Sequence, residues 1–152
     1  MSFLNALINE LRDEELAERL EERIAIIQHK IKFMDKVTVV ILDTYNGSNA
    51  VLEGLLNDAG GVLQEDPLTA RVVIYCEKDM SMLQLMGMVP ALLATEWPAV
   101  EYNRVYLWDD PAAVLADPAT AVEALEDLAE MLYPGYFVFG NEGKTWISFK
   151  TQ

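Results

Sequence analysis

Acidic side chains gather at three points in this sequence where a predicted strand ends. They are Asp43 after KVTVVIL, Glu77 and Asp79 after RVVIYC, and Asp109 and Asp110 after RVYLW. The carboxylates of Asp43, Asp109 and Asp110, together with Asp117 further along the loop after the third strand, could hold a hard cation such as Ca²⁺ or Mg²⁺, because such cations prefer oxygen ligands. These carboxylates lack the alternating spacing of a calcium loop, however, so a cation site is an alternative and the metal it would hold is unknown.

Aromatic and amide side chains accompany the acids at these strand ends. Tyr45 and Asn46 follow the first strand, and Trp108 ends the third. Open α/β sheets bind ligands beyond the carboxyl ends of their strands. We therefore expect a ligand site at this edge of the sheet, formed by Tyr45, Asn46, Glu77, Asp79, Trp108, Asp109 and Asp110.

Nucleophiles and bases are scarce. Cys76 is the one cysteine, which excludes a disulfide within the chain, and His29 is the one histidine. Lys78 and a following helix N-terminus could lower the pKa of Cys76 and make it reactive, but a small buried residue at a strand end is the favoured interpretation. His29 is expected to be a solvated helix residue. Since GxSxG, GxGxxG and P-loop motifs are also missing, we expect neither an enzyme nor a cofactor.

The elements that must position these residues alternate between strand and helix. Strands rich in β-branched residues are predicted at 36–43, 71–75 and 104–108, and apolar spacing predicts helices at 50–61, 80–93 and 120–133. This order predicts a three-layer α/β/α sandwich with a mostly parallel sheet, preceded by a long N-terminal backbone-type helix.

Three segments carry more specific expectations. The helix at 80–93 is apolar nearly all round and holds four methionines, so core packing is favoured over an adaptable ligand surface. The helix at 120–133 is expected to turn Leu125 and Leu128 inward and its acids outward; those acids are Glu123, Glu126, Asp127 and Glu130. The tail, 136–150, is predicted to form two short β segments around a turn at 141–143.

Residues 1–35 are predicted to be a helical segment that packs on an α/β domain of residues 36–152, giving one globular unit. A short helix, a break, and a longer helix to about residue 33 are expected. The first helix is more apolar than a free terminal helix needs to be, so we expect a homo-oligomer through its apolar stripe. That stripe is Phe3, Leu4, Leu7, Ile8 and Leu11.

Charge and hydropathy exclude some partners. The 152 residues carry 11 Lys and Arg against 25 Asp and Glu, a formal net charge of −14. Such a chain repels nucleic acid and anionic lipid. No run of about 18 apolar residues predicts membrane insertion, and the N-terminus lacks the basic flank of a signal peptide. The expected location is the cytoplasm, or the periplasm if the chain is a fragment of a longer precursor.

Several motifs occur in an order that is familiar from one protein family. Ala59-Gly60-Gly61 ends the first αβ unit, Trp97 precedes the strand at 104–108, and the last helix runs into LYPGYF at 132–137. This order resembles the C-terminal lobe of helical-backbone substrate-binding proteins, which serve ABC importers of cobalamin, siderophores, haem and metal ions. The resemblance covers nearly the whole chain from about residue 3, with residues 14–33 as the backbone helix.

The resemblance implies a non-catalytic binding module for a metal chelate or a cation. Family members hold the ligand between two lobes, and a second copy of this chain is expected to replace the missing lobe. The loop after the third strand, DDPAAVLADPAT, contains no arginine to pair with an anionic siderophore. The alternative function is a cytosolic interaction or scaffold protein without a small-molecule ligand.

Overall fold

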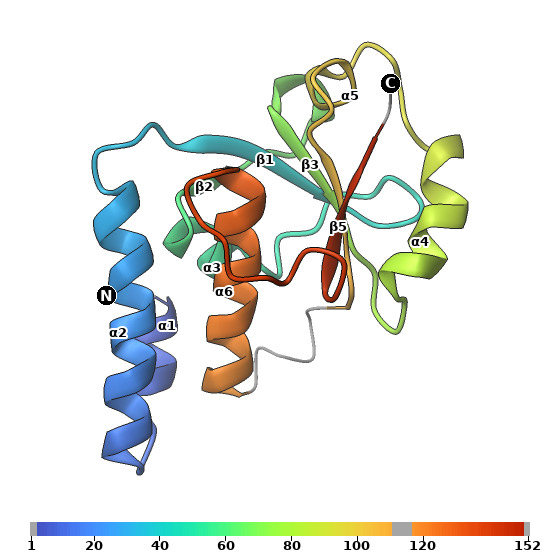
Figure 1. Ribbon diagram of the computed structural model, residues 1–152. Helices are drawn as coiled ribbons and strands as arrows, with labels where there is room; N and C mark the ends of the chain where they lie inside the picture. Colours follow the sequence, from blue (N-terminus) through green and yellow to red (C-terminus); the bar gives the residue numbers. More distant parts are fainter. Residues whose placement is uncertain (1–2, 111–116, 151–152) are drawn as a thin grey trace.

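In the part of the chain that the computed structural model describes, residues 3–110 and 117–150, five strands form one sheet in the order β2-β1-β3-β4-β5 (Figure 1). The strands are β1 Val37–Leu42, β2 Gly61–Leu63, β3 Val72–Tyr75, β4 Val105–Trp108 and β5 Trp146–Phe149. β1 to β4 are parallel, and β5 is antiparallel to β4. The predicted, mostly parallel sheet is confirmed.

Helices cover both faces of this sheet (Figure 1). Val39 and Ile41 of β1 face α1, α2, α3 and α6, whereas Val40 and Leu42 face α4 and α5. The bounds are α1 Phe3–Ile8, α2 Glu14–Ile31, α3 Glu53–Asp58, α4 Met82–Met88, α5 Pro98–Glu101 and α6 Pro118–Leu132, with 3₁₀ turns at Pro67–Thr69 and Val89–Ala91. Both faces of the inner strands are therefore buried, as the β-branched runs predict, and the three-layer α/β/α sandwich is confirmed.

The N-terminal helices pack on the domain that follows them. α1 and α2 are separate helices, as predicted, and the Asp13 side chain caps α2 by accepting a hydrogen bond from the Leu16 N–H. Leu4 and Ile8 are buried in the chain's own core, where α1 meets α3 and α6. The apolar stripe of α1 is thus largely used inside the chain, which removes the excess of exposed apolar surface that motivated self-association through this helix.

The methionine-rich segment forms a shorter helix than the predicted 80–93. Ser81 and Gln84 make a capping box at the start of α4, and a 3₁₀ turn containing Pro90 follows Met88 because proline lacks the N–H that continues a helix. Leu85 is fully buried, yet Leu83 is 69% exposed. The prediction that this helix packs in the core is therefore confirmed for only one of its sides.

The predicted hairpin at 136–150 is wrong in its first arm. Only 146–149 forms a strand, β5, and it pairs with β4 rather than with the preceding segment. Phe137 and Phe139 stack on each other, with ring centroids 5.8 Å apart, and pack against the core beside α6. Burial of Phe137 and partial burial of Phe139 hold the segment over the helix, so it is not available as a strand partner.

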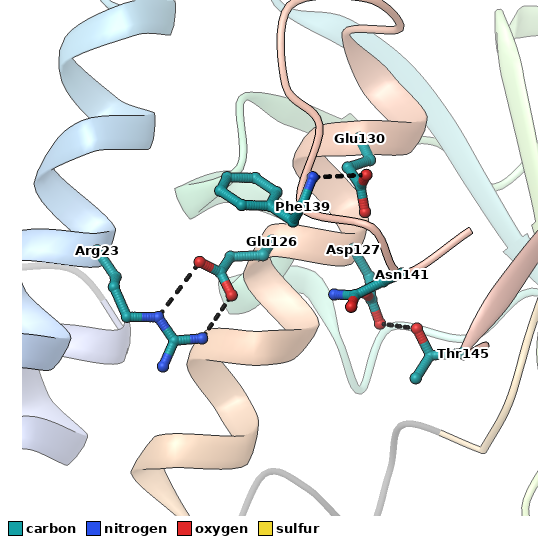
Figure 2. Close-up of polar contacts among 7 residues, drawn as sticks. All are labelled: Arg23, Glu126, Asp127, Glu130, Phe139, Asn141 and Thr145. Carbon is teal, nitrogen blue, oxygen red and sulfur yellow. Dashed lines mark hydrogen bonds and ion pairs between the residues drawn. The ribbon is translucent and has the colours of Figure 1, made fainter. Parts of the chain in front are cut away.

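The outward orientation predicted for the acids of α6 is also wrong for three of the four. Glu126, Asp127 and Glu130 are buried, while Glu123 is exposed. The segment at 137–145 and helix α2 cover the side of α6 that a lone amphipathic helix would leave to solvent (Figure 2). Tertiary contacts therefore override the local pattern here.

Candidate functional site

The loop that leaves β1 is a compact turn held by one carboxylate. Asp43 Oδ1 accepts hydrogen bonds from the N–H groups of Tyr45 (2.8 Å) and Gly47 (2.9 Å), and Asn46 has a positive φ of 58°. Tyr45 projects from this turn and is 89% exposed. Asp43 is thus a structural residue of the turn that presents Tyr45.

The exits of β1, β3 and β4 are bonded to one another. Glu77 Oε1 accepts hydrogen bonds from the N–H (3.1 Å) and hydroxyl (2.6 Å) of Thr44, which joins the β1 and β3 exits. The N–H of Asp79 donates to Asp110 Oδ2 at 2.8 Å, which joins the β3 and β4 exits. Three loops far apart in sequence therefore form one continuous edge. We call the edge made by residues 43–52, 76–79 and 109–110 the exit edge.

Asp109 has a different structural task at this edge. Its Oδ1 accepts a hydrogen bond from the N–H of Met82 at 2.6 Å, at the beginning of α4. A carboxylate is favourable at a helix N-terminus, where N–H groups lack intrahelical partners. Asp109 thus fixes α4 relative to β4.

A hollow of about 250 Å³ opens in the exit edge. Its lining combines apolar Val51, Leu52 and Cys76 with polar side chains, which are those of Asn49, Glu77, Lys78 and Asp110. Val51 is 66% exposed although it is apolar. Ligand sites commonly combine an apolar lining with a few polar groups, so this hollow has the composition of a small-molecule site.

The structure brings some of the predicted site residues to the hollow and not others. Glu77 and Asp110 line it, whereas Tyr45, Asp79 and Asp109 lie in the adjoining loops of the exit edge. Sequence reasoning missed Asn49, Val51 and Leu52; an apolar valine directly after the turn NGSNA is the signal that could have indicated them.

Two predicted site residues point elsewhere. Trp108 is 1% exposed and faces α6, where its indole N–H donates to Asp127 Oδ2 at 3.0 Å. Asn46 accepts a hydrogen bond from the Tyr75 hydroxyl (2.7 Å) and donates to the carbonyl of Leu92 (2.8 Å). Both side chains thus stabilise the fold.

The loop after β4 was noted in the sequence for its lack of arginine. Its residues 111–116 lie outside the described residues.

Cys76 does not have the environment of a nucleophile. It is 4% exposed, and burial, together with Asp110, Asp43 and Glu77, raises the pKa of its thiol to about 12. The favoured interpretation, a small buried residue at a strand end, is confirmed. Lys78 and the following helix do not lower this pKa, because desolvation and three carboxylates both oppose the thiolate. His29 is exposed on α2, as predicted. Within residues 3–110 and 117–150, no cluster of three or more His, Cys, Asp or Glu side chains could hold a metal ion.

A second polar centre, which sequence reasoning missed, lies on α6 (Figure 2). Asp127 accepts hydrogen bonds from Trp108, Asn141 (2.8 Å) and Thr145 (2.9 Å), and it thereby connects α6, β4 and the turn before β5. Burial and, to a smaller extent, Glu130 raise the pKa of Asp127, the three hydrogen bonds lower it, and the net result is a pKa of about 6. Desolvation is the larger effect.

The neighbouring acids of α6 are bonded as well. Glu126 forms an ion pair with Arg23 of α2, and Glu130 accepts hydrogen bonds from the Phe139 N–H (3.0 Å) and the Trp146 indole N–H (3.3 Å). Each acid therefore ties α6 to a different part of the chain. The three acids thus fix the position of α6 in the fold.

Three solved structures share this fold. A substrate-binding protein of an ABC transporter from Listeria monocytogenes EGD-e is similar with a TM-score of 0.60 and 19% identity, over 86% of this chain and 62% of that one. The TroA-like periplasmic binding protein FepB from Veillonella parvula is similar with a TM-score of 0.61 and 16% identity, over 82% of this chain and 47% of that one. Helicobacter pylori CeuE, solved as a Ni-His complex, is similar with a TM-score of 0.58 and 13% identity, over 84% of this chain and 47% of that one.

The chain spans less than two thirds of the length of each of these three proteins. No family model and no curated protein matches the sequence. No helix among the described residues is long and apolar enough to span a membrane. The fold implied by the motif order is nevertheless confirmed: this chain has the fold of one lobe of an ABC-transporter substrate-binding protein.

Proposed function

We propose that this chain is a non-catalytic binding module whose exit edge holds a small ligand. The observation that carries the proposal is the hollow of about 250 Å³ at the carboxyl ends of the parallel strands. This is the place where open α/β sheets bind ligands. The proposal is supported by the fold, which is that of proteins named for substrate binding.

The charges around the hollow favour a cationic ligand or a cationic metal chelate. Glu77 and Asp110 line it, Asp43 and Asp79 are in the adjoining loops, and Lys78 is the one basic side chain in the lining. The net charge of −14 adds to the same field. An anionic ligand would meet repulsion from both the local and the overall charge.

The size of the hollow indicates half of a binding site. Pockets that bury a drug-sized ligand have volumes of about 300–1,000 Å³, and this one is about 250 Å³. A second surface that closes over the exit edge would complete the site. We propose that a second copy of this chain provides it, with the exposed side chains of Tyr45 and Val51 at the contact rather than the buried Leu4 and Ile8 of α1.

A thermal-shift screen tests ligand binding. The panel contains divalent cations, the cationic corrinoid aquocobalamin and, as an anionic comparison, haem. A specific ligand raises the melting temperature in a concentration-dependent manner, and we expect this for a cationic member of the panel. The alternative, a scaffold protein without a small ligand, predicts no shift with any of them.

Two tyrosine variants locate the effect. Tyr45→Ala should reduce the ligand-induced shift, because it removes an exposed aromatic group from the exit edge. Tyr136→Ala, at an exposed tyrosine outside that edge, is the matched control and should leave the shift unchanged. Light scattering with and without the ligand then tests pairing. A ligand shift that is equally reduced in both variants would refute the assignment of the site.

A further inference from the structure

A second cavity lies on a different part of the sheet. It has a volume of about 480 Å³ and runs along the α6-facing side of β4 and β5, beneath residues 134–142. Its lining includes Asn103 and Arg104 before β4 and Lys150 after β5, which are at the opposite end of β4 from the exit edge. Its volume is within the range of about 300–1,000 Å³ typical of small-molecule sites.

Aromatic rings form the walls of this cavity. Tyr106 and Trp146 meet edge to face, with ring centroids 5.5 Å apart, and Phe137 lines the cavity from the overlying segment. All three rings are nearly buried, with exposed fractions between 4% and 6%. Val138 also lines the cavity but is 85% exposed, so it belongs to the mouth. A flat apolar group would be enclosed by rigid aromatic surfaces here.

Arg104 provides a fixed positive charge in the same cavity. Its Nε donates to the Tyr106 hydroxyl (2.9 Å), and its Nη2 donates to the carbonyl oxygens of Met131 (3.1 Å) and Leu132 (3.2 Å) at the end of α6. All of these acceptors are uncharged. The guanidinium, which is only partly exposed, forms no salt bridge among the described residues, and none of them accepts a hydrogen bond from its Nη1.

The acids in the lining form no salt bridge with Arg104 among the described residues. Both carboxylate oxygens of Glu130 already accept hydrogen bonds, from the Phe139 N–H and the Trp146 indole. Glu142 and Lys150, which are both exposed, also line the cavity, and their opposite charges offset each other. Partly buried charges are normally paired, so the cavity lacks an anion beside Arg104.

From this geometry we propose that the cavity is a second binding site, specific for a small aromatic carboxylate. The carboxylate would pair with the free Nη1 side of the Arg104 guanidinium, and the ring would lie between Tyr106, Trp146 and Phe137. The two N–H groups of Nη1 are the donors left for a carboxylate, and a hydrogen bond between ionised groups is stronger than one between neutral groups. This site opposes the exit edge in charge preference, so the two would take different ligands.

The probes are benzoate and indole-3-acetate, with benzamide and indole-3-acetamide as neutral controls of nearly the same shape. Binding is followed in two-dimensional ¹H–¹⁵N NMR spectra of the full chain through the indole N–H signals of its three tryptophans. The signal of Trp146 is assigned with Trp146→Phe. The carboxylates should shift that signal saturably and the amides should not, while the Trp97 signal stays in place.

Two charge variants isolate the role of the cavity. Val138→Glu places a negative charge at the mouth, and Ile26→Glu places the same charge on α2, where the side chain is 60% exposed. Val138→Glu should weaken benzoate binding relative to Ile26→Glu by up to about fivefold, which is the effect of one unit charge about 4 Å away in water. Both substitutions are at exposed positions, so the fold is retained.

The proposal is overturned by any of three results. These are no saturable shift with either carboxylate, equal affinity for the carboxylates and their amides, or equal weakening by Val138→Glu and Ile26→Glu. The first result would mean that Arg104 only caps α6. The test is independent of the exit edge, because none of the probes or variants involves residues of that edge.

Discussion

Replacing Asp127 with asparagine tests whether a buried carboxylate makes this fold more stable in mild acid than at neutral pH. Asp127 is 4% exposed, and its pKa in the folded chain is raised from 3.8 to about 6. Because the folded pKa is above the unfolded one, the folded state binds the proton more tightly. The stabilisation from Asp127 is therefore fully present below about pH 4 and is lost as the pH rises to about 6.

The magnitude follows from the size of the shift. Each pKa unit corresponds to about 1.4 kcal/mol, so a rise of about two units predicts that up to about 3 kcal/mol is lost between about pH 4 and about pH 7. Asparagine has nearly the same shape and cannot ionise. Its oxygen can accept the hydrogen bonds of Trp108 and Thr145, and Asn141 can turn its own amide over to accept from the new NH₂ group.

The measurement is urea unfolding followed by tryptophan fluorescence between about pH 4 and about pH 7. The free energy of unfolding of Asp127→Asn, relative to that of the parent chain, should increase over this interval by about 1–3 kcal/mol. Glu123→Gln removes an exposed carboxylate of the same helix and is the matched control, which should run parallel to the parent. If the Asp127→Asn curve also runs parallel to the parent, ionisation of Asp127 does not cost the folded state free energy.

Two further predictions concern Cys76 and the contact between α2 and α6. With a thiol pKa of about 12 and 4% exposure, Cys76 should resist iodoacetamide at about pH 8 in the native chain and react after unfolding; rapid native alkylation would refute the buried environment. Glu126→Gln should cost about 1 kcal/mol, because it removes the charge that Arg23 Nε contacts at 3.2 Å on a partly exposed side chain. Urea unfolding measures the loss, which should shrink at high salt, and a loss no larger than that of Glu123→Gln would mean that the ion pair contributes nothing.

The sheet and its layers could be predicted because their signals are local. The run VTVVIL has the β-branched composition of a strand buried on both faces, and Ser81 with Gln84 has the spacing of a capping box. These patterns depend on neighbours within one or two turns of chain. The motif order that resembles substrate-binding proteins rests on such patterns, which is why the fold implied by it was right.

The buried acids of α6 and the orientation of Trp108 depend on long-range contacts. Helical periodicity assigns Asp127 to the solvent side, and only the arrival of Asn141 and Thr145 makes that side an interior. Trp108 ends a strand next to acids that belong to the exit edge. Because side chains along a strand point alternately to its two faces, the Trp108 side chain lies on the face covered by α6. The sequence places both residues on the correct element, but it does not show which side of that element becomes buried by contacts with distant parts of the chain.

The hydrogen bonds between the strand exits have a consequence for how the exit edge would engage a partner. Thr44, Glu77, Asp79 and Asp110 are already fixed relative to one another, so these loops have little conformational entropy left to lose on association. Among the large hydrophobic side chains of this edge, the ordering cost falls mainly on Tyr45, which is 89% exposed. The edge should therefore meet its ligand as a preformed surface, and any closing movement would take place between rigid bodies rather than within this chain.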